Sequence, residues 1–123
     1  MEEKRKFVRL EAPIQVKYRI SAKSNTQNKS LGKDISVSGV RMLVGEKMIP
    51  GTQLDLEINI PEYDKIIFAT GEIVWQEETL IKQEVTHETG LKFVKIASED
   101  QDKIGKYIYK QLNARFRNPE EEI

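Results

Sequence analysis

The residues best suited to ligand chemistry lie near the start of the chain, where Lys4, Arg5, Lys6 and Arg9 place four cations within six residues. Arg5 and Arg9 are four residues apart, so both guanidinium groups can reach one ligand if they sit on a flexible arm. Arginine pairs bidentately with phosphate and with the O6/N7 edge of guanine, and its plane stacks on bases. The segment therefore indicates either a ligand with phosphates and a base, or a solvated basic tail.

A second polar group follows later in the chain, in the run DISVSG at residues 34–39. In an extended chain Asp34, Ser36 and Ser38 share one side. A carboxylate is the natural partner of the N1–H and N2–H₂ donors of guanine, and Gly39 allows a backbone turn that a side chain would block. The alternative is a turn between two strands that the Asp or Ser side chains stabilise.

Alternation of apolar and polar residues predicts the strands that position these groups. In the expected second strand, Leu31 and Ile35 face inward, and Gly71 in the fifth suggests a bulge or a close approach of another backbone. Six short strands at roughly ten-residue spacing indicate an antiparallel barrel. The expected strands cover residues 14–20, 30–35, 40–44, 54–60, 66–76 and 85–93.

The period of the pattern changes after the last strand. Ser98 and Gln101 have the spacing of a capping box at a helix start, and apolar residues follow at helical spacing as far as Leu112. Asn118-Pro119 is expected to end this helix. The expected fold class is therefore all-β with a terminal helix, a six-stranded antiparallel barrel followed by one C-terminal α-helix.

Three parts of the chain are expected: a flexible basic arm at residues 1–12, a barrel-and-helix domain at 13–117 and a disordered acidic tail at 118–123. The length of 123 residues fits one domain. No apolar run approaches the ~20 residues needed to span a bilayer, and the N-terminus lacks the apolar region of a signal peptide. We expect a cytoplasmic protein with no membrane insertion.

The charge of the chain is balanced in total but divided along its length. Residues 1–47 hold eleven basic and five acidic side chains, a net charge of +6, whereas residues 48–123 hold nine and fifteen, a net charge of −6. Such asymmetry fits an anionic ligand, a nucleic acid or a membrane surface, but a solvated face with no ligand is the more common cause.

The residue types needed for catalysis are scarce. The chain has no cysteine and one histidine, which excludes thiolate and multi-histidine metal sites. His87 lies in the apolar phase of an expected strand, which favours a structural role. Asp55 and Glu57 lie on the solvent side of another strand, and no P-loop or dinucleotide fingerprint is present. We therefore expect no enzymatic activity, no metal and no cofactor.

The order and spacing of these motifs resemble those of the PilZ domain family, which binds the bacterial second messenger cyclic di-GMP. The resemblance covers essentially the whole chain, with Arg-x-x-x-Arg at Arg5 and Arg9 and Asp-x-Ser-x-x-Gly at residues 34–39. Residues 71–75, GEIVW, are similar to the family's Gly-x-Val-x-Trp strand, and residues 90–93, GLKF, to its late Gly-x-x-Phe strand.

The resemblance implies a role for each matching residue. Arg5 and Arg9 would contact phosphates and guanine Hoogsteen edges, with one arginine plane stacked on a base. Asp34 would accept hydrogen bonds from a guanine Watson–Crick edge. Ser36 would bond the guanine or the arm, and Gly39 would make room for the ligand.

Two further positions have open roles. Lys4 directly precedes the first motif, where the family's residue influences whether one ligand or an intercalated ligand pair is bound. A cation there favours the pair, but lysine is not arginine, so the stoichiometry stays open. Trp75 either stacks near a base or belongs to the core or the barrel surface.

The sequence thus predicts a ligand-gated effector. Cyclic di-GMP would order the arm against the barrel and change a surface that a protein partner or a neighbouring domain reads, with motility, exopolysaccharide synthesis or a related process as the output. One alternative is a small barrel that binds single-stranded nucleic acid, which the scarcity of aromatic side chains opposes. The other is a PilZ-like module without ligand that acts through protein contacts, which the intact motifs oppose.

Overall fold

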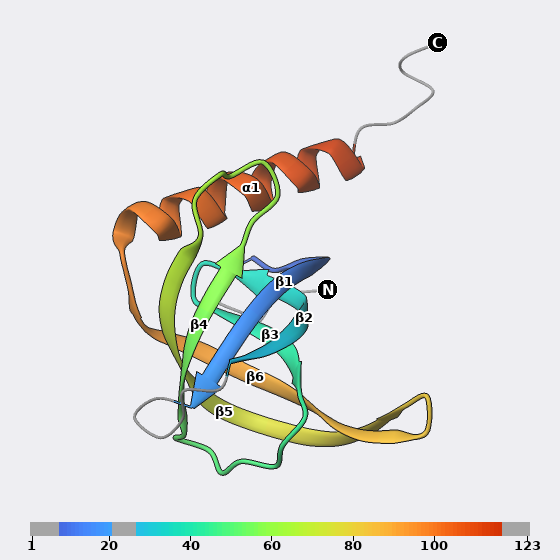
Figure 1. The fold of residues 1–123 in the computed structure, drawn as a ribbon. Coiled ribbons are helices and arrows are strands. Elements are labelled where there is room, and N and C mark those ends of the chain that lie inside the picture. Colours follow the sequence, from blue (N-terminus) through green and yellow to red (C-terminus); the bar gives the residue numbers. More distant parts are fainter. Residues whose placement is uncertain (1–7, 21–26, 117–123) are drawn as a thin grey trace.

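A computed structural model describes residues 8–20 and 27–116 and shows a closed barrel of six strands with one helix (Figure 1). Neighbouring strands are antiparallel and follow the order β1-β2-β3-β6-β5-β4 around the barrel. This architecture confirms the predicted fold class. The elements are β1 (Leu10–Ile20), β2 (Asn28–Ser36), β3 (Gly39–Val44), β4 (Gln53–Asn59), β5 (Ile67–Ile81), β6 (Glu84–Ile96) and α1 (Ser98–Phe116).

Part of the expected chain organisation lies outside the described residues. This applies to residues 1–7 of the expected arm, with Lys4 and Arg5, and to the expected acidic tail at 118–123, which contains the expected helix stop. The expected boundary between the arm and the barrel-and-helix domain, at residues 12 and 13, lies within the described part. β1 begins ahead of the expected domain start at residue 13, because Leu10 is buried and pairs with β2.

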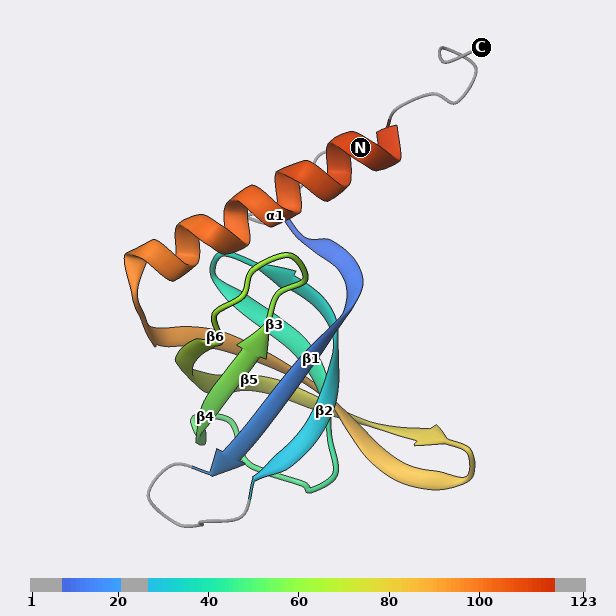
Figure 2. The ribbon, with the colours of Figure 1, turned by 45° about the horizontal axis from the view of Figure 1, so that its top comes forward.

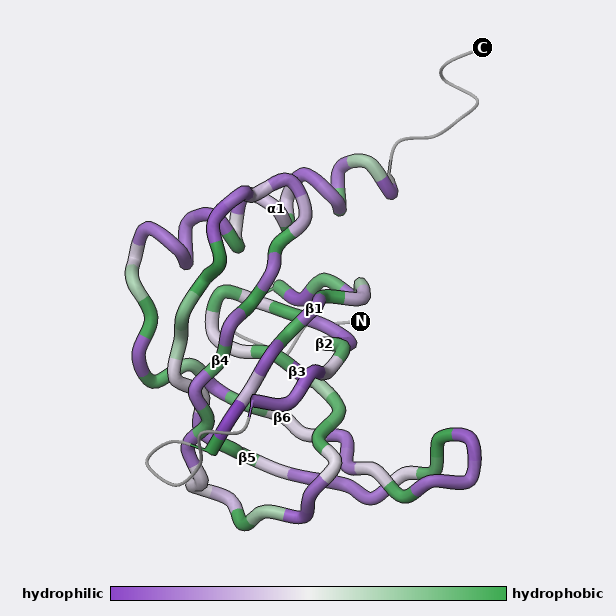
Figure 3. The backbone as a smooth tube through the Cα atoms, in the orientation of Figure 1, coloured by the Kyte–Doolittle hydropathy of each residue, from purple (hydrophilic) through white to green (hydrophobic). Residues whose placement is uncertain are grey.

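The barrel interior is filled by the apolar phase of each strand, and Figure 3 shows the resulting alternation of hydrophobic and hydrophilic residues along the strands. The clearest predicted stripe, Leu54, Leu56, Ile58 and Ile60, is buried as expected. Each fully buried side chain of this kind contributes roughly 1.5–3 kcal/mol by leaving water. The closed barrel therefore rests on a single core to which all six strands contribute.

The helix α1 lies across one end of the barrel (Figure 2). Ile104 and Ile108 are buried against the core, and Leu112 is partly buried against it, as the helical spacing predicts. The helix includes Ser98, and the Ala97 carbonyl oxygen accepts its first hydrogen bond, 3.0 Å from the Gln101 amide, so Ala97 and not the predicted Ser98 is the N-cap residue. The side chain of Gln101 reaches across to the barrel, where its Nε2 donates a hydrogen bond of 2.9 Å to the Val37 carbonyl oxygen.

The prediction that Leu31 faces inward is wrong, since 49% of this residue is exposed. The register of β2 against β3 shifts between Gly32 and Asp34, so Lys33 is an extra residue on the β2 side. A bulge of this kind reverses the inward and outward phases of a strand. Gly32 therefore faces inward before the bulge and Ile35 after it, which leaves Leu31 outside.

Two register shifts also interrupt the pairing of β5 with β6. The first lies between Thr70 and Gly71, which confirms the irregularity expected at that glycine. The second lies between Ile73 and Trp75, and it inserts Val74 as an extra residue on β5. After this second bulge Trp75 lies opposite Gly90 on the outer face, although strict alternation from the buried Ile73 would turn its side chain into the core.

The β5–β6 hairpin is longer than predicted and extends beyond the barrel (Figure 1). Its tip at Lys82 and Gln83 has positive φ at both residues, the conformation of a tight two-residue turn. Leu80 and Val85 pair across the hairpin but remain exposed. Because both faces of this part meet solvent, its sequence lacks the alternation that marks a half-buried strand.

The β2–β3 connection is a two-residue turn, Val37-Ser38, that brings β3 unusually close to β6. Gly39 pairs with Lys92, and the Phe93 amide donates a 2.8 Å hydrogen bond to the Ser38 carbonyl oxygen. A Cβ at position 39 would lie 2.1 Å from the Leu91 carbonyl oxygen. Glycine is therefore required here by the strand pairing itself.

Replacing Gly39 by alanine is expected to destabilise the fold, because a methyl group would overlap a backbone oxygen of β6. Overpacking of this kind costs about 1–3 kcal/mol, which corresponds to a fall in Tm of roughly 4–15 °C for a small domain. Thermal unfolding followed by circular dichroism measures the change.

Gly45→Ala is the matched control, because a Cβ at that position meets nothing within 4 Å. It should melt within a degree or two of the wild-type protein, since surface substitutions cost at most about 0.5 kcal/mol. Equal melting of the wild-type, Gly39→Ala and Gly45→Ala proteins would contradict the close approach of β3 and β6.

Candidate ligand-binding site

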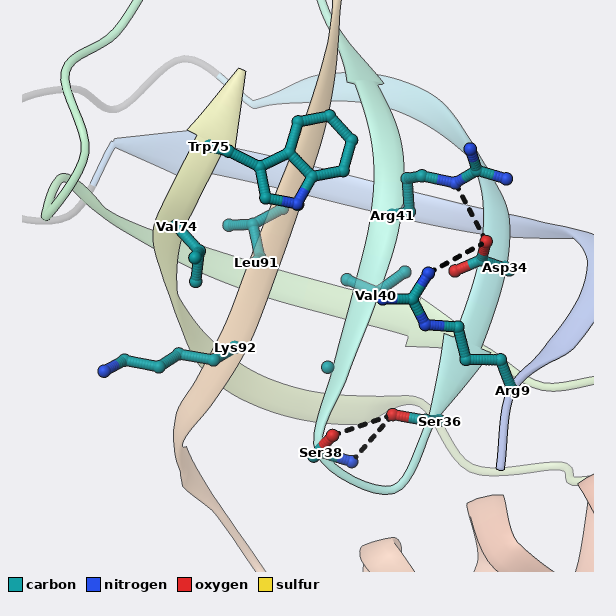
Figure 4. A pocket seen from close by; sticks show the side chains of 12 residues that line it. Arg9, Asp34, Ser36, Ser38, Val40, Arg41, Val74, Trp75, Leu91 and Lys92 are labelled. Carbon is teal, nitrogen blue, oxygen red and sulfur yellow. Dashed lines mark hydrogen bonds and ion pairs between the residues drawn. The ribbon is translucent and has the colours of Figure 1, made fainter. Parts of the chain in front are cut away.

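A pocket of about 360 Å³ opens on the outer wall of the barrel, over β2, β3 and β6 and the bulged part of β5 (Figure 4). Its volume lies at the lower end of the range for small-molecule sites, roughly 300–1,000 Å³. It is lined by Arg9, Asp34, Ser36, Ser38, Gly39, Val40, Arg41, Val74, Trp75, Gly90, Leu91 and Lys92.

Asp34 is the most deeply buried charged group of the pocket, with 5% of its side chain exposed. The β2 bulge turns it to the outer wall, whereas strict alternation would aim it into the apolar interior. A buried carboxylate is costly without a cation beside it. Arg41 Nε lies 2.8 Å from Asp34 Oδ2, and Arg9 Nη1 lies 3.8 Å from the same oxygen.

Arg41 is held between two acids from two neighbouring strands. It pairs with Asp34 across the β2–β3 ladder, and its Nη1 donates a 2.9 Å hydrogen bond to Glu88 Oε1 on β6. Lys33 Nζ lies 3.6 Å from the same Glu88 oxygen. The sequence reasoning missed Arg41, although a turn at residues 36–39 already places position 41 opposite position 34, where opposite charges attract.

The Ser36–Ser38 segment forms the serine-stabilised turn that the sequence offered as an alternative. Ser36 Oγ accepts a 3.1 Å hydrogen bond from the Ser38 amide and lies 2.9 Å from Ser38 Oγ. The Gln101 side chain holds the same turn from α1 through the Val37 carbonyl. A turn role does not exclude a ligand role, since a hydroxyl oxygen accepts a second hydrogen bond.

The opposite wall of the pocket is formed by Trp75 and β6. Trp75 is half-buried, and its indole lies against Gly90, where an added Cβ would come within 2.3 Å of the ring nitrogen. Glycine at position 90 therefore makes space for the ring. Lys92 stands at the rim, with its Nζ 3.4 Å from Glu72 Oε2. Gly90 and Lys92 were not singled out as site residues from the sequence.

The structure thus gathers most of the candidate residues into one place. Arg9, Asp34, Ser36, Gly39 and Trp75 all line this pocket, although they come from distant parts of the sequence. Lys4 and Arg5 lie outside the described residues, so the first motif is represented here by its second arginine.

The residues for which the sequence predicts a structural or solvent-facing role, and no ligand, lie away from the pocket. His87 is buried among the strands, as its apolar phase predicts, and Asp55 pairs with Arg19 on the β1–β4 side of the barrel. Within residues 8–20 and 27–116, no group of three or more His, Asp or Glu side chains is placed to hold a metal ion. None of the described helical segments is long and apolar enough to cross a membrane.

Comparison with solved structures shows similar folds at low sequence identity. The Bacillus subtilis inhibitor of motility MotI/DgrA superimposes with a TM-score of 0.76 at 19% identity, over 94% of this chain and 55% of that one. The PilZ domain of Escherichia coli YcgR, solved with cyclic di-GMP, gives 0.71 at 16% identity, over 92% and 95%. The K. pneumonia MrkH–cyclic di-GMP complex gives 0.71 at 14%, over 95% and 56%.

The chain therefore spans about half the length of MotI/DgrA and MrkH but nearly all of the isolated YcgR domain. No curated protein matches the sequence. The family model described as "PilZ domain" matches residues 3–110, which is most of the chain. Together with the six-stranded barrel, its terminal helix and the order of the motifs, this match shows that the chain belongs to the PilZ domain family.

Proposed function

We propose that this chain is a cytoplasmic receptor for cyclic di-GMP and that the pocket over β2, β3 and β6 is its binding site. The observation that carries the proposal is that Arg9, the second arginine of the first motif, meets the second motif in one pocket, 3.8 Å from the buried Asp34. The YcgR domain and MrkH, which share the fold, were solved with this ligand.

Each wall of the pocket suits a different part of the ligand. Asp34 accepts hydrogen bonds from the N1–H and N2–H₂ donors of one guanine. Arg9, with Arg5 of the same motif, binds phosphate or a guanine Hoogsteen edge through its planar fork. The half-buried face of Trp75 offers a stacking surface, since base–aromatic stacking contributes about 1–3 kcal/mol per base. Lys92 at the rim adds a cation for a phosphate.

The loose pairing of Arg9 with Asp34 fits a residue that changes partners. The Arg9 side chain is 38% exposed, and 3.8 Å is long for a charge-assisted contact. Its transfer to a ligand phosphate therefore costs little. We propose that this transfer orders the basic arm on the barrel, with the entropy cost offset by the new hydrogen bonds.

The helix α1 is placed to pass this change on. Arg115 Nη2 donates a 2.6 Å hydrogen bond to the Glu11 carbonyl oxygen, two residues after Arg9, while Gln101 holds the Val37 turn. One helix thus contacts the backbone near Arg9 and the backbone between Ser36 and Ser38, all of which line the site. We propose that a protein partner or a neighbouring domain reads the surface formed by α1 and the ordered arm. Control of motility or exopolysaccharide synthesis is the proposed output, and the fold of a motility inhibitor supports the former.

Titration calorimetry of the purified chain with cyclic di-GMP is expected to give saturable binding, and its stoichiometry distinguishes one ligand from an intercalated pair. Arg9→Ala and Asp34→Asn should each weaken binding by roughly 10- to 100-fold, because a hydrogen bond to a charged group contributes about 1.5–3 kcal/mol. Absence of heat and of saturation with the wild-type protein would overturn the proposed function.

Arg19→Ala serves as the control for diffuse electrostatic attraction. Arg19 is an exposed arginine that pairs with Asp55 on the other side of the barrel, and it does not line the pocket. Its loss should leave the affinity unchanged. An effect equal to that of Arg9→Ala would show that net charge, and not the pocket, attracts the ligand.

The affinity is expected to depend weakly on salt, because the ligand carries only two phosphates. Binding of single-stranded nucleic acid would show a logarithmic slope of about −0.7 for every phosphate contacted. Dissociation constants measured between about 50 and 200 mM salt distinguish the two. A steep slope, together with equal affinity for an oligonucleotide, would favour the nucleic-acid alternative over the proposed function.

A further inference from the structure

We propose that Arg41 is a positioning residue that holds the Asp34 carboxylate in place to read a guanine edge, and that Glu88 fixes Arg41 for this task. The inference rests on the proposed function and adds to it two residues that neither binding motif contains. The base specificity of the site then depends on a chain of ion pairs across three strands, from Glu88 on β6 through Arg41 on β3 to Asp34 on β2.

The first support is the fixed position of the Arg41 guanidinium. The side chain rises from the middle of β3, with Asp34 on one neighbouring strand and Glu88 on the other. Its Nε lies 2.8 Å from Asp34 Oδ2, and its Nη1 lies 2.9 Å from Glu88 Oε1. Acids on both sides hold the planar fork in one orientation, which an isolated ion pair on a flexible side chain would not do.

The second support is that Arg41 holds Asp34 more closely than Arg9 does. Both contact the same carboxylate oxygen, Oδ2, but Arg9 precedes β1 and is 1.0 Å farther away, at 3.8 Å against 2.8 Å. If Arg9 moves to a phosphate when ligand binds, the buried carboxylate needs another cation. Arg41 supplies that cation from a strand, and its contact leaves the other carboxylate oxygen directed to the middle of the pocket (Figure 4).

The third support is an incomplete hydrogen bond. Arg41 Nε is buried, and despite the 2.8 Å separation its N–H is not aligned with an acceptor among the described residues. Buried donors in native proteins are nearly always satisfied. A small rotation of the Asp34 carboxylate on guanine binding would align Oδ2 with this donor, so that the ion pair becomes a charge-assisted hydrogen bond.

The consequence is a specific effect on base selection. Hypoxanthine differs from guanine only by lacking the exocyclic N2 amine, so the inosine analogue, cyclic di-IMP, keeps the phosphates, sugars and Hoogsteen edges of the ligand. A carboxylate positioned on the Watson–Crick edge should favour the guanine ligand by a factor of about ten or more. Loss of Arg41 should reduce this preference for guanine but keep the contacts of the protein with the ligand phosphates.

The test measures dissociation constants for cyclic di-GMP and cyclic di-IMP with the wild-type, Arg41→Gln, Asp34→Asn and doubly substituted proteins. Arg41→Gln should reduce the ratio of the two constants to within about threefold of unity, as Asp34→Asn should. In the Asp34→Asn background, Arg41→Gln should change neither constant by more than about twofold, because two residues that act through one contact are not additive.

Two further variants separate positioning from a general loss of structure. Glu88→Gln leaves both residues of the pair intact and should reduce the ratio in the same direction by a smaller factor. Arg41→Lys, which keeps the charge, should retain part of the preference for cyclic di-GMP over cyclic di-IMP. The ratio is unaffected by the fraction of folded protein, since both ligands meet the same population. Arg19→Gln, the matched arginine control, should leave the ratio unchanged.

The outcomes are distinguishable from failure of the proposed function. If the wild-type protein binds neither cyclic dinucleotide, the proposed function and this inference both fall. If it binds cyclic di-GMP but the effects of Arg41→Gln and Asp34→Asn add, or if Arg41→Gln weakens both ligands equally, the ligand assignment stands and Arg41 is not a positioning residue. Equal affinity of the wild-type protein for the two ligands would also overturn the inference.

Discussion

A carboxylate that leaves water needs a cation beside it, and the candidate site is arranged around that need. Asp34 is about as buried as the barrel core, yet it faces the pocket, with Arg41 opposite it on the adjacent strand. The register that joins them depends on the two-residue β2–β3 turn, and this turn depends on Gly39 for its close approach to β6. The helix α1 holds the same turn from outside. The Asp34–Arg41 ion pair therefore depends on the β2–β3 turn, on the close approach of this turn to β6 and on its contact with α1.

Backbone bulges decide which side chains reach the pocket. The extra residue on β2 turns Asp34 out of the apolar interior, and the extra residue on β5 does the same for Trp75. Bulges are common beside functional sites because they redirect a side chain without moving the rest of the strand. Here two such bulges, on strands that are not neighbours in the barrel, supply facing walls of one pocket.

Most of the fold could be predicted because burial on one face imposes strict alternation, as in the stripe from Leu54 to Ile60. The prediction failed at Leu31, where a bulge reverses the phase, and in the outer β5–β6 hairpin, where solvent on both faces removes the pattern. The motifs identified Arg9, Asp34, Ser36 and Gly39 as candidates. Arg41 and Gly90 were missed because their importance comes from strand pairing, which brings them against Asp34 and Trp75.

The proposed function requires that cyclic di-GMP occupies the pocket over β2, β3 and β6. Titration of isotope-labelled protein with cyclic di-GMP, followed by NMR, tests this most directly. The changing signals are expected to cluster at Arg9, at residues 34–41, at Trp75 and at residues 90–92, while those of Arg19 and Asp55 stay constant. Shifts centred on the Arg19–Asp55 side of the barrel, or no shifts at saturating ligand, would contradict it.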